Sequence, residues 1–324
     1  MPSLAFVNSY QREGGQRDIR NISRNEQLCL QGRRRGMIYN LGSINIDYFY
    51  TLPKLPAAGE TLAAKEFDIG LGGKGANMSV AVARAGGDIC HIGNVGKDGA
   101  WAVDYMKGAG VDVSGVLMIQ EPTGHAIIYR DSEGENSIVI YPGANALQDK
   151  DRITAALSKA KSGDVLLLQN ETNLQAFAAG LAHKAGMRVA YAAAPFDVNA
   201  LNDVLPYIHI LVLNTVEMAQ LLEQTDHTPD TLGLDLLVVT KGAEGCMVYS
   251  KETVEKHVPA FPVNPIDTTG AGDTFTGYFL AHLDLGGSIE DALHQANAAA
   301  ALMVTKKGTA NAIPFASEVE QFLG

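Results

Sequence analysis

From residue 37 onward, short and nearly continuous apolar runs alternate with segments of helical periodicity. The runs are MIYNLG, ICHIGNVG, DVLLLQN, RVAYAAA, IHILVLN and LDLLVVT, and the helix-like segments include NMSVAVARAG and AWAVDYMKGAG. Strands without polar alternation are typical of parallel sheets that are buried on both faces. The sequence therefore predicts an α/β fold with a central, mostly parallel sheet and helices on both faces.

Two regions break this alternation and predict a second, smaller sheet. Residues 46–69 have the pattern of two exposed strands around a turn that contains Pro and Gly. Residues 124–141 alternate in polarity around SEGE, which is typical of a β-hairpin. Because small strands inserted at one end of an α/β sheet make a plausible cover, we expect a small β-sheet lid from these two ranges.

The first 36 residues differ from the remainder in charge. They hold seven Arg and no Lys against three acidic residues, a net charge of +4, and they lack the apolar segment of a secretory signal. We expect residues 1–36 to be a disordered extension or tag and residues 37–324 to form the α/β domain. A transit peptide and a basic docking arm are alternatives that the acidic residues disfavour.

The net charge of the whole chain, −11, bears on the class of partner. Nucleic acid and anionic membranes attract basic surfaces, so neither is expected as the main partner. No apolar run approaches the length of a membrane span. The three cysteines, Cys29, Cys90 and Cys246, have no metal-type spacing, and we expect a reducing, cytoplasmic setting.

GLGGKGAN, at residues 70–77, has the glycine spacing of a dinucleotide-binding loop. That motif requires a core strand before it and an acidic residue about twenty positions later. The preceding AKEFDI has mixed polarity, and Asn94 stands near the acidic position, so dinucleotide binding is disfavoured. An ordinary Walker A loop is excluded because Gly75 follows Lys74 where Ser or Thr is needed.

What remains in GLGGKGAN is a glycine turn that opens a helix, with Lys74 and Asn77 beside it. Glycine permits close approach of the backbone, which suits a polar ligand. A tight strand-to-helix turn without a ligand is the alternative.

DTTGAGD, at residues 267–273, places two carboxylates around a Gly-Ala-Gly turn at the start of an apolar helix. The glycines allow successive N–H groups to converge on one point, and the helix adds the positive end of its dipole. Gly-Ala-Gly is a poor helix start by propensity, and a helix cap needs only one acid. The pattern therefore favours an anion hole with Asp273 as a base over a simple cap.

Two shorter stretches follow apolar strands. LNTVE places Asn214 and Glu217 on one side of a helical turn, with oxygen atoms that suit Mg²⁺ directly or through water. TKGAEG, at residues 240–245, ends a strand in a glycine turn that suits phosphates or a ribose. Each signal is weak by itself, because such residues are common after strands.

Together these motifs resemble those of the ribokinase-like (PfkB) carbohydrate kinases, and the resemblance covers nearly all of residues 37–324. GSINID, GGKGAN, NTVE, TKGAEG and DTTGAGDTFTG occur in the order and spacing of that family. GGKGAN and DTTGAGDTFTG are specific, and the shorter motifs, with EGEN, GAN and KKG, are supportive. The resemblance implies an ATP-dependent kinase that phosphorylates a sugar hydroxyl.

The resemblance also implies a role for each site residue. Asp273 would accept the proton of the sugar's primary hydroxyl, and the backbone of Gly270, Ala271 and Gly272 would form the anion hole. The sugar would be bound by Asn45, Asp47, Gly73, Asn77 and Glu171, with Lys74 near the phosphates or stabilising the turn. The nucleotide would be bound by Asn214, Thr240, Gly242, Gly245, Gly272 and Asn297. Glu217 would organise Mg²⁺ through water.

A monovalent cation, K⁺, is implied beside the anion hole. Its ligands would be Asp267, Thr269 and the carbonyl groups of Met303, Lys306 and Gly308. The chain departs from the family pattern here, because Ala312 stands where the family has a serine ligand. A second departure is Ala192, in YAAAPF, where an Asn is usual.

The reaction implied by the resemblance is in-line transfer of the γ-phosphoryl group of ATP to the 5-hydroxyl of D-ribose. The alternatives are another kinase of the family, acting on deoxyribose, fructose or a nucleoside, and a non-catalytic sugar sensor. ATP, Mg²⁺ and K⁺ are the expected cofactors, and the expected partners are a small sugar and ATP. Exposed strands of the lid would pair two copies of the chain into a homodimer.

Overall fold

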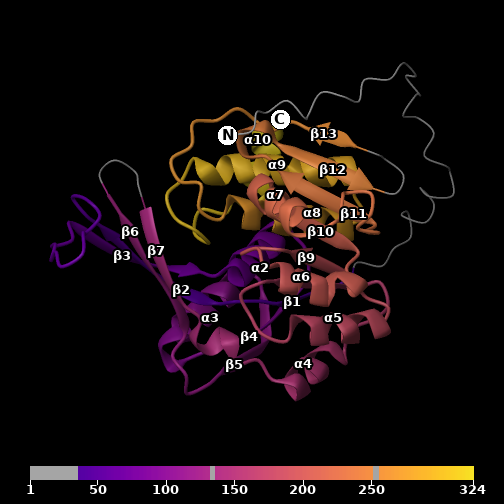
Figure 1. Cartoon of the computed structure of the whole chain (residues 1–324), viewed down its shortest axis with the longest axis horizontal. Helices are drawn as coiled ribbons and strands as arrows, with labels where there is room; N and C mark the ends of the chain where they lie inside the picture. Colours follow the sequence, from indigo (N-terminus) through magenta and orange to yellow (C-terminus); the bar gives the residue numbers. More distant parts are fainter. Residues whose placement is uncertain (1–35, 132–135, 251–254) are drawn as a thin grey trace. The chain divides into compact units, whose positions relative to one another are not determined.

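The computed structural model describes residues 36–131, 136–250 and 255–324, so all but the last residue of the predicted extension lies outside the described residues. A nine-stranded sheet forms the centre of the described chain, in the order β13-β12-β11-β10-β9-β8-β1-β4-β5 (Figure 1). Its strands are β1 (Ile38–Leu41), β4 (Ile89–Val95), β5 (Asp112–Met118), β8 (Val165–Gln169), β9 (Arg188–Ala192), β10 (Ile210–Asn214), β11 (Leu236–Thr240), β12 (Cys246–Ser250) and β13 (Lys256–Val258).

In this sheet order, all neighbouring strands from β11 to β5 pair in parallel. Strands β12 and β13 pair antiparallel and form one edge. The six apolar runs of the sequence are all parallel strands of this sheet. The predicted mostly parallel sheet is therefore confirmed. The antiparallel edge was not predicted, because its strands are half-buried and lack a continuous apolar pattern.

Helices cover both faces of the large sheet and bury two apolar cores. In β8, Val165 and Leu167 point into one core and Leu166 and Leu168 into the other, as side-chain alternation along a strand requires. The first core includes α2 (Lys74–Arg84), α3 (Ala100–Gly108), α8 (Ala271–Asp284), α9 (Ile289–Val304) and α10 (Ala316–Leu323). The second includes α4 (Lys150–Leu157), α5 (Gln175–Lys184), α6 (Val198–Val204) and α7 (Thr215–Gln224).

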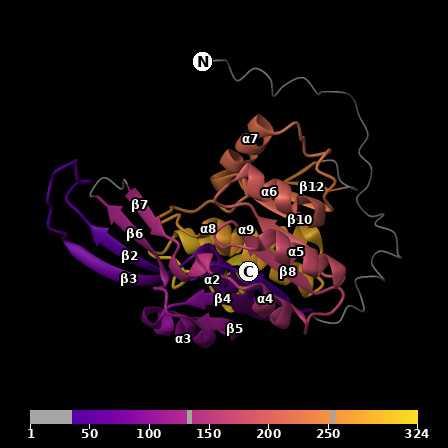
Figure 2. The same ribbon diagram turned by 60° about the horizontal axis from the view of Figure 1, so that its bottom comes forward.

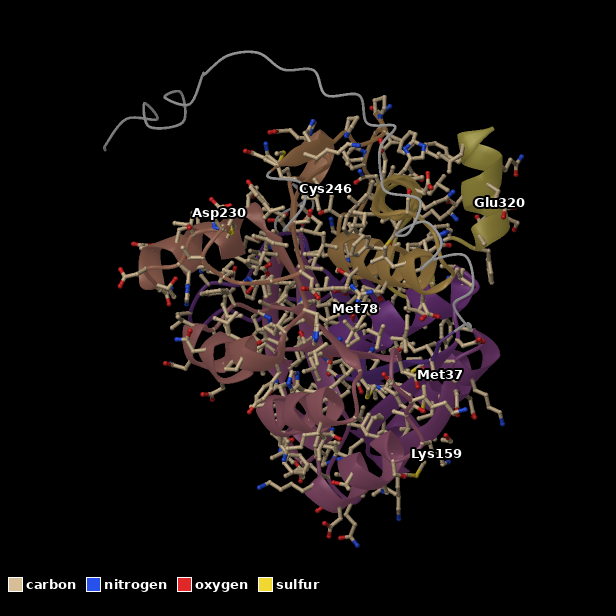
Figure 3. The ribbon with its side chains drawn as sticks, turned by 90° about the vertical axis from the view of Figure 1, so that its right-hand side faces the viewer. Met37, Met78, Lys159, Asp230, Cys246 and Glu320 are labelled. Atoms are coloured by element: carbon tan, nitrogen blue, oxygen red, sulfur yellow. The ribbon has the colours of Figure 1, made fainter. Side chains whose placement is uncertain are left out.

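Side-chain placement follows this layering. Figure 3 shows Met78 and Cys246 among the interior side chains, whereas Lys159, Asp230 and Glu320 lie at the periphery. Within the described ranges, no helix is both long and apolar enough to cross a lipid bilayer.

A second sheet contains four strands in the order β3-β2-β6-β7 (Figure 2). The strands are β2 (Asn45–Thr51), β3 (Glu66–Gly72), β6 (Gly124–Arg130) and β7 (Asn136–Tyr141), which fall in or beside the two ranges predicted to form a small sheet. In β2, Asn45, Asp47 and Phe49 point to one face of this small sheet, and Ile46, Tyr48 and Tyr50 point to the other.

The glycine-rich stretch begins within the small sheet. Gly70 and Gly72 belong to β3, which pairs antiparallel with β2, and α2 starts two residues later. A dinucleotide-binding loop would instead follow a core strand of the large sheet. The structure thus explains why the G-x-G-x-x-G spacing does not mark a dinucleotide site.

A buried polar network lies beneath the start of α2. The ring of His91, on β4, contacts the Gly42 carbonyl through Nε2 at 3.1 Å and the Ser79 hydroxyl through Nδ1 at 2.8 Å. Since the carbonyl only accepts, Nε2 carries the proton and Nδ1 accepts from Ser79. Asn40 donates to the same hydroxyl at 2.8 Å. Burial lowers the pKa of His91 to about 4, against a weaker opposing effect of the Gly42 hydrogen bond, so His91 is neutral at neutral pH.

This network predicts a pH-dependent loss of stability. Because the pKa of His91 is lower in the folded than in the unfolded chain, its contribution to stability is complete above pH 6.5 and is lost as the pH falls toward 4. The loss should reach on the order of 3 kcal/mol near pH 4 and about 2 kcal/mol at pH 5. Urea unfolding of the wild type and His91→Gln at pH 7.5 and pH 5 measures it, with a steeper decline expected in the wild type. Parallel declines in the two proteins would contradict the prediction.

Candidate active site

The site lies beside β1, where the order in which the chain adds strands to the sheet changes direction. From β1, the chain order proceeds through β4 to β5 on one side and through β8 to β11 on the other. In open α/β sheets, ligands bind outside the carboxyl ends of the strands at such a point. The turn after β1 and the turn after β8 meet there, since the Ser43 hydroxyl donates to the Glu171 carboxylate.

The turn that opens α2 packs directly against the turn after β1. Gly73 has a left-handed φ of 88°, and a Cβ atom at Gly75 would lie 2.4 Å from the Ser43 nitrogen. Only glycine allows this approach. The Lys74 N–H then donates to Glu171 at 3.0 Å, and the Ser43 hydroxyl accepts from the Gly75 N–H at 3.2 Å. The glycines therefore allow one backbone segment to approach another, and the predicted contact with a polar ligand stays a prediction.

Asp273 lies in the first turn of α8, directly beside the first turn of α2. The preceding Gly270 has a left-handed φ of 80°, which turns the chain into the helix. The Asp273 side chain is buried and accepts from the Asn77 amide nitrogen at 2.9 Å. The Asn77 amide oxygen is also buried and has no partner among the described residues. It is therefore a free acceptor next to a fixed carboxylate, as a bound hydroxyl group would require.

Three carboxylates and one ammonium group share this region. Burial, together with the charges of Glu171 and Asp273, raises the pKa of Asp47 to about 7. The charge of Asp273, with a smaller effect of Glu171, raises the pKa of Lys74 against the opposing effect of burial. Lys74 therefore stays protonated, and its Nζ lies 4.0 Å from a Glu171 carboxylate oxygen. The region attracts hydrogen-bond donors while holding one positive charge.

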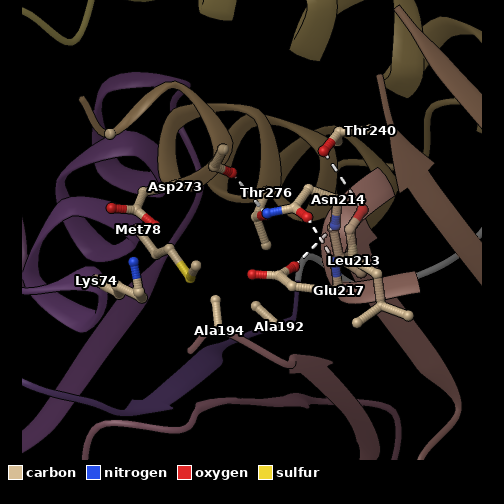
Figure 4. A pocket seen from close by; sticks show the side chains of 13 residues that line it. Lys74, Met78, Ala192, Ala194, Leu213, Asn214, Glu217, Thr240, Asp273 and Thr276 are labelled. Atoms are coloured by element: carbon tan, nitrogen blue, oxygen red, sulfur yellow. Dashed lines mark hydrogen bonds between the residues drawn. The ribbon is translucent and has the colours of Figure 1, made fainter. Parts of the chain in front are cut away.

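A cleft of about 190 Å³ continues from Asp273 toward the large sheet (Figure 4). Figure 4 shows Lys74 and Asp273 on one side of the cleft and Asn214 and Glu217 on the other. The lining comprises Lys74, Met78, Ala192, Ala194, Val212, Leu213, Asn214, Glu217, Thr240, Gly270, Gly272, Asp273 and Thr276. The cleft thus brings two predicted features together. One is the Gly270–Gly272 turn, the predicted anion hole (hereafter the anion turn), and the other is one part of the predicted nucleotide site.

Asn214 and Glu217 are also partners in a capping box at the start of α7. The Asn214 side chain accepts from the Glu217 N–H, and the Glu217 carboxylate accepts from the Asn214 N–H, each at 2.8 Å. Figure 4 shows the Glu217 carboxylate pointing into the cleft. It has a free oxygen that fits a water-linked Mg²⁺. In the described ranges no three His, Cys, Asp or Glu residues gather as a metal site.

Three predicted nucleotide-binding residues lie outside the cleft lining. Gly242 and Gly245 form the turn between β11 and β12, with left-handed φ values of 56° and 97°. The Asn297 amide donates to the carbonyl groups of Val258 and Pro259, at 3.3 and 3.2 Å. These contacts give the three residues structural roles, and their contact with a nucleotide stays a prediction.

The predicted cation ligand Asp267 has nitrogen donors around it. Its carboxylate accepts from the Thr269 N–H at 3.0 Å, the Gly308 N–H at 3.2 Å and the Arg130 guanidinium at 2.9 Å. The Lys306 side chain pairs with Glu318, and the Met303 carbonyl accepts from the Lys306 N–H. The Arg130 guanidinium therefore supplies a positive charge beside Asp267, and binding of K⁺ there stays a prediction.

Sequence reasoning missed three residues that position this region. Ser43 links the turns after β1 and β8, and Arg130 binds Asp267. The Asn145 amide donates to the Asn45 side chain at 2.7 Å and accepts from the Ile44 N–H at 2.9 Å, which fixes the orientation of Asn45. The motif GAN contains Asn145, and GSINID contains Ser43, so both had a signal in the sequence. Arg130 had none.

Comparison with known proteins places the chain in a family. The family model for pfkB carbohydrate kinases matches residues 36–316. The chain belongs to this family, and it is a carbohydrate kinase by that membership. It is 35% identical to the ribokinase of Haemophilus influenzae, over 87% of this chain and 97% of that protein. It is 31% identical to the deoxyribokinase of Salmonella typhi, over 87% and 97% of the two chains.

Solved structures support the same family. The ribokinase of Thermotoga maritima matches with a TM-score of 0.81 and 32% identity, over 89% of this chain and 99% of that one. The ribokinase of Arabidopsis thaliana, solved with ribose and ATP, matches with a TM-score of 0.79 and 30% identity, over 90% and 99%. The predicted ribokinase-like fold is confirmed.

The crowding of carboxylates predicts that Asp47 destabilises the folded chain at neutral pH. Its pKa of about 7 is above that of an unfolded Asp, so the folded chain binds the proton more tightly. The destabilisation is complete above pH 7 and fades as the pH falls toward 4. Asp47→Asn should therefore raise the unfolding free energy at pH 8 by at most about 4 kcal/mol, and by much less at pH 5. Urea unfolding checks this.

The exposed Asp230→Asn serves as the control and should change stability little at either pH, because its carboxylate is solvated. An equal effect of Asp47→Asn at pH 8 and pH 5 would contradict the raised pKa.

Proposed function

We propose that this chain transfers the γ-phosphoryl group of ATP to the 5-hydroxyl of D-ribose. The observation that carries the proposal is the buried Asp273 in the first turn of α8, which accepts a hydrogen bond from Asn77 and follows the left-handed Gly270 by three residues. Relatives that are similar over nearly their whole length include ribokinases, and one ribokinase was solved with ribose and ATP.

Asp273 is the proposed base. A sugar hydroxyl that donates to its carboxylate would lie at the positive end of the α8 dipole, where the first-turn N–H groups have no partner within the helix. The backbone of Gly270, Ala271 and Gly272 would stabilise the charge of the transferred group there. Lys74, protonated and on the same side of the cleft, adds a positive charge. Position and charge carry most of the catalysis in phosphoryl transfer.

The proposed sugar site is the polar surface between the small sheet and the two turns. Asp47 and Asn45 face it from β2, and Asn77 and Glu171 from α2 and the turn after β8. Gly73 has a φ of 88° and no side chain, so the backbone of the turn would contact the sugar as well. Neighbouring hydroxyl groups of a pentose match such acceptors, and a buried acceptor without a partner disfavours a deoxy sugar.

ATP is proposed to bind in the cleft, with Asn214, Thr240 and Glu217 opposite the anion turn. Mg²⁺ bound with the nucleotide would neutralise charge on its phosphates, and Glu217 would hold a water of that ion. K⁺ stays a prediction that the contacts of Asp267 do not favour. A cytoplasmic location is proposed from the acidic net charge and the buried free thiols of Cys90 and Cys246.

Deoxyribose is the alternative substrate that a specific observation supports. Deoxyribokinases are among the relatives, at 31% identity. In addition, Ala192 stands where the family usually has an amide side chain, so the chain departs from the ribokinase pattern there. Fructose and nucleosides are further candidates within the family, and a non-catalytic sugar sensor would bind sugar without turnover.

An assay of ADP release tests the proposal with ribose, deoxyribose, fructose and adenosine as acceptors. Ribose should give the highest kcat/KM, and Asp273→Asn should lower kcat by about a thousandfold because the base is lost. The exposed Asp230→Asn is the matched control and should keep full activity. Preferred turnover of another acceptor would refute the substrate assignment. Full activity of Asp273→Asn would refute the base, and sugar binding without ADP release would identify a sensor.

The small sheet is proposed as the lid and as the dimer interface. Its face away from Asp47 exposes Phe67, Ile69, Val139 and Tyr141, each close to half exposed or more. Such an apolar face is typical of an interface between copies. Sedimentation velocity should show a dimer for the wild type and a monomer for Val139→Lys. Leu222→Lys, at an exposed apolar position on α7, should stay dimeric. A monomeric wild type would refute the interface.

A further inference from the structure

Arg130 joins the small sheet to the segment before the anion turn. It ends β6 and pairs with Thr51 of β2, so its side chain shares the face that carries Asp47. Its guanidinium donates to the Asp267 carboxylate at 2.9 Å and lies 4.4 Å from the centre of the Phe49 ring. Arg130 is therefore held in one position by an ion pair and a cation–π contact.

Asp267 links Arg130 to the residue that precedes the anion turn. One carboxylate oxygen accepts from the Thr269 N–H, in the residue directly before Gly270. The other accepts from Arg130 and from the Gly308 N–H. Burial alone would raise the pKa of Asp267, but the hydrogen bonds from Thr269 and Gly308 and the charge of Arg130 hold it below the usual value. Asp267 is thus an anion whose charge is balanced by a residue of the small sheet.

A second contact attaches the small sheet at the same place. The Thr309 hydroxyl donates to the Leu71 carbonyl, at the end of β3, at 2.6 Å. Thr309 follows Gly308, which itself donates to Asp267. The two turns at residues 267–269 and 308–309 therefore hold both β3 and β6.

The charge of Asp267 is already balanced by a residue of the chain itself. Both carboxylate oxygens accept from N–H groups, and the buried Ala312 has no side-chain oxygen. The Arg130 guanidinium supplies the positive charge directly, and arginine stays protonated at every pH of interest.

We propose that Arg130 is a positioning residue whose guanidinium is the built-in counter-charge of Asp267. It couples closure of the small sheet over the sugar to the geometry of the Gly270–Gly272 turn and makes a monovalent metal ion dispensable. This inference rests on the proposed kinase function. It implies that sugar binding and ordering of the anion turn are favoured together, because the same ion pair contributes to both.

Kinetics of the full-length protein in K⁺ and in tetramethylammonium test the proposal. The wild type should differ by less than about twofold between the two salts, because Arg130 replaces the metal ion. Arg130→Met keeps an apolar side chain on Phe49 but removes the charge, and it should raise the sugar KM and lower kcat/KM by about fivefold or more. Arg130→Lys should recover part of this loss.

Two controls make the result specific. Lys54→Met removes an ion pair with Glu60 that lies within the segment between β2 and β3. It should leave all kinetic constants unchanged. Adding Asp267→Asn to Arg130→Met should cause little further loss, since the pair acts as a unit. A wild type that requires K⁺, or an Arg130→Met protein with wild-type kinetics, would overturn the proposal.

Trp101 gives a readout that does not depend on turnover. It is the only tryptophan of the chain, and it lines a cleft of about 910 Å³ together with Phe49, Arg130 and Asp267. Acrylamide should quench Trp101 more strongly in Arg130→Met than in the wild type and in Lys54→Met. Absence of sugar phosphorylation would overturn the kinase proposal alone. Equal quenching of Trp101 in the three proteins would overturn the proposed coupling through Arg130.

Discussion

Helices α2 and α8 pack so closely that no side chain fits between them at Gly277. A Cβ atom there would lie 2.4 Å from the Ala81 side chain and 2.7 Å from the Met78 carbonyl. One helical turn earlier in each helix, Asn77 contacts Asp273. The two helices therefore run parallel and in register, and both of their N-termini open at the same cleft. The positive dipole ends of both helices meet the site, which favours anions there.

This packing explains how the site tolerates its carboxylates. Asp47, Glu171 and Asp273 are close enough that burial of Asp47 and the charges of the other two carboxylates raise the pKa of Asp47 to about 7. Lys74 and the two helix N-termini offset part of the repulsion between the three carboxylates. The part that remains contributes to the raised pKa of Asp47. Such arrangements are typical of functional sites, where binding chemistry is obtained at the expense of stability.

Much of this arrangement could be predicted from local sequence. The apolar runs predicted the parallel strands, and the glycines of GGKGAN and DTTGAGD predicted turns that open helices. Contacts between distant residues could not be predicted from periodicity. Ser43 and Glu171 are 128 residues apart, and Arg130 and Asp267 are 137 apart. For Asn297, the family resemblance implied a nucleotide contact, but its amide donates to backbone carbonyl groups that no local pattern reveals.

The pairing of Asn77 with Asp273 spans 196 residues of the chain. Asp273 and the amide that contacts it are therefore synthesised far apart in time, and the site is incomplete in a chain that stops before α8. During synthesis the emerging polypeptide holds the GGKGAN turn and Asn77 without Asp273. Under the proposed mechanism, phosphoryl transfer requires that α8 and the helices after it have left the ribosome and docked.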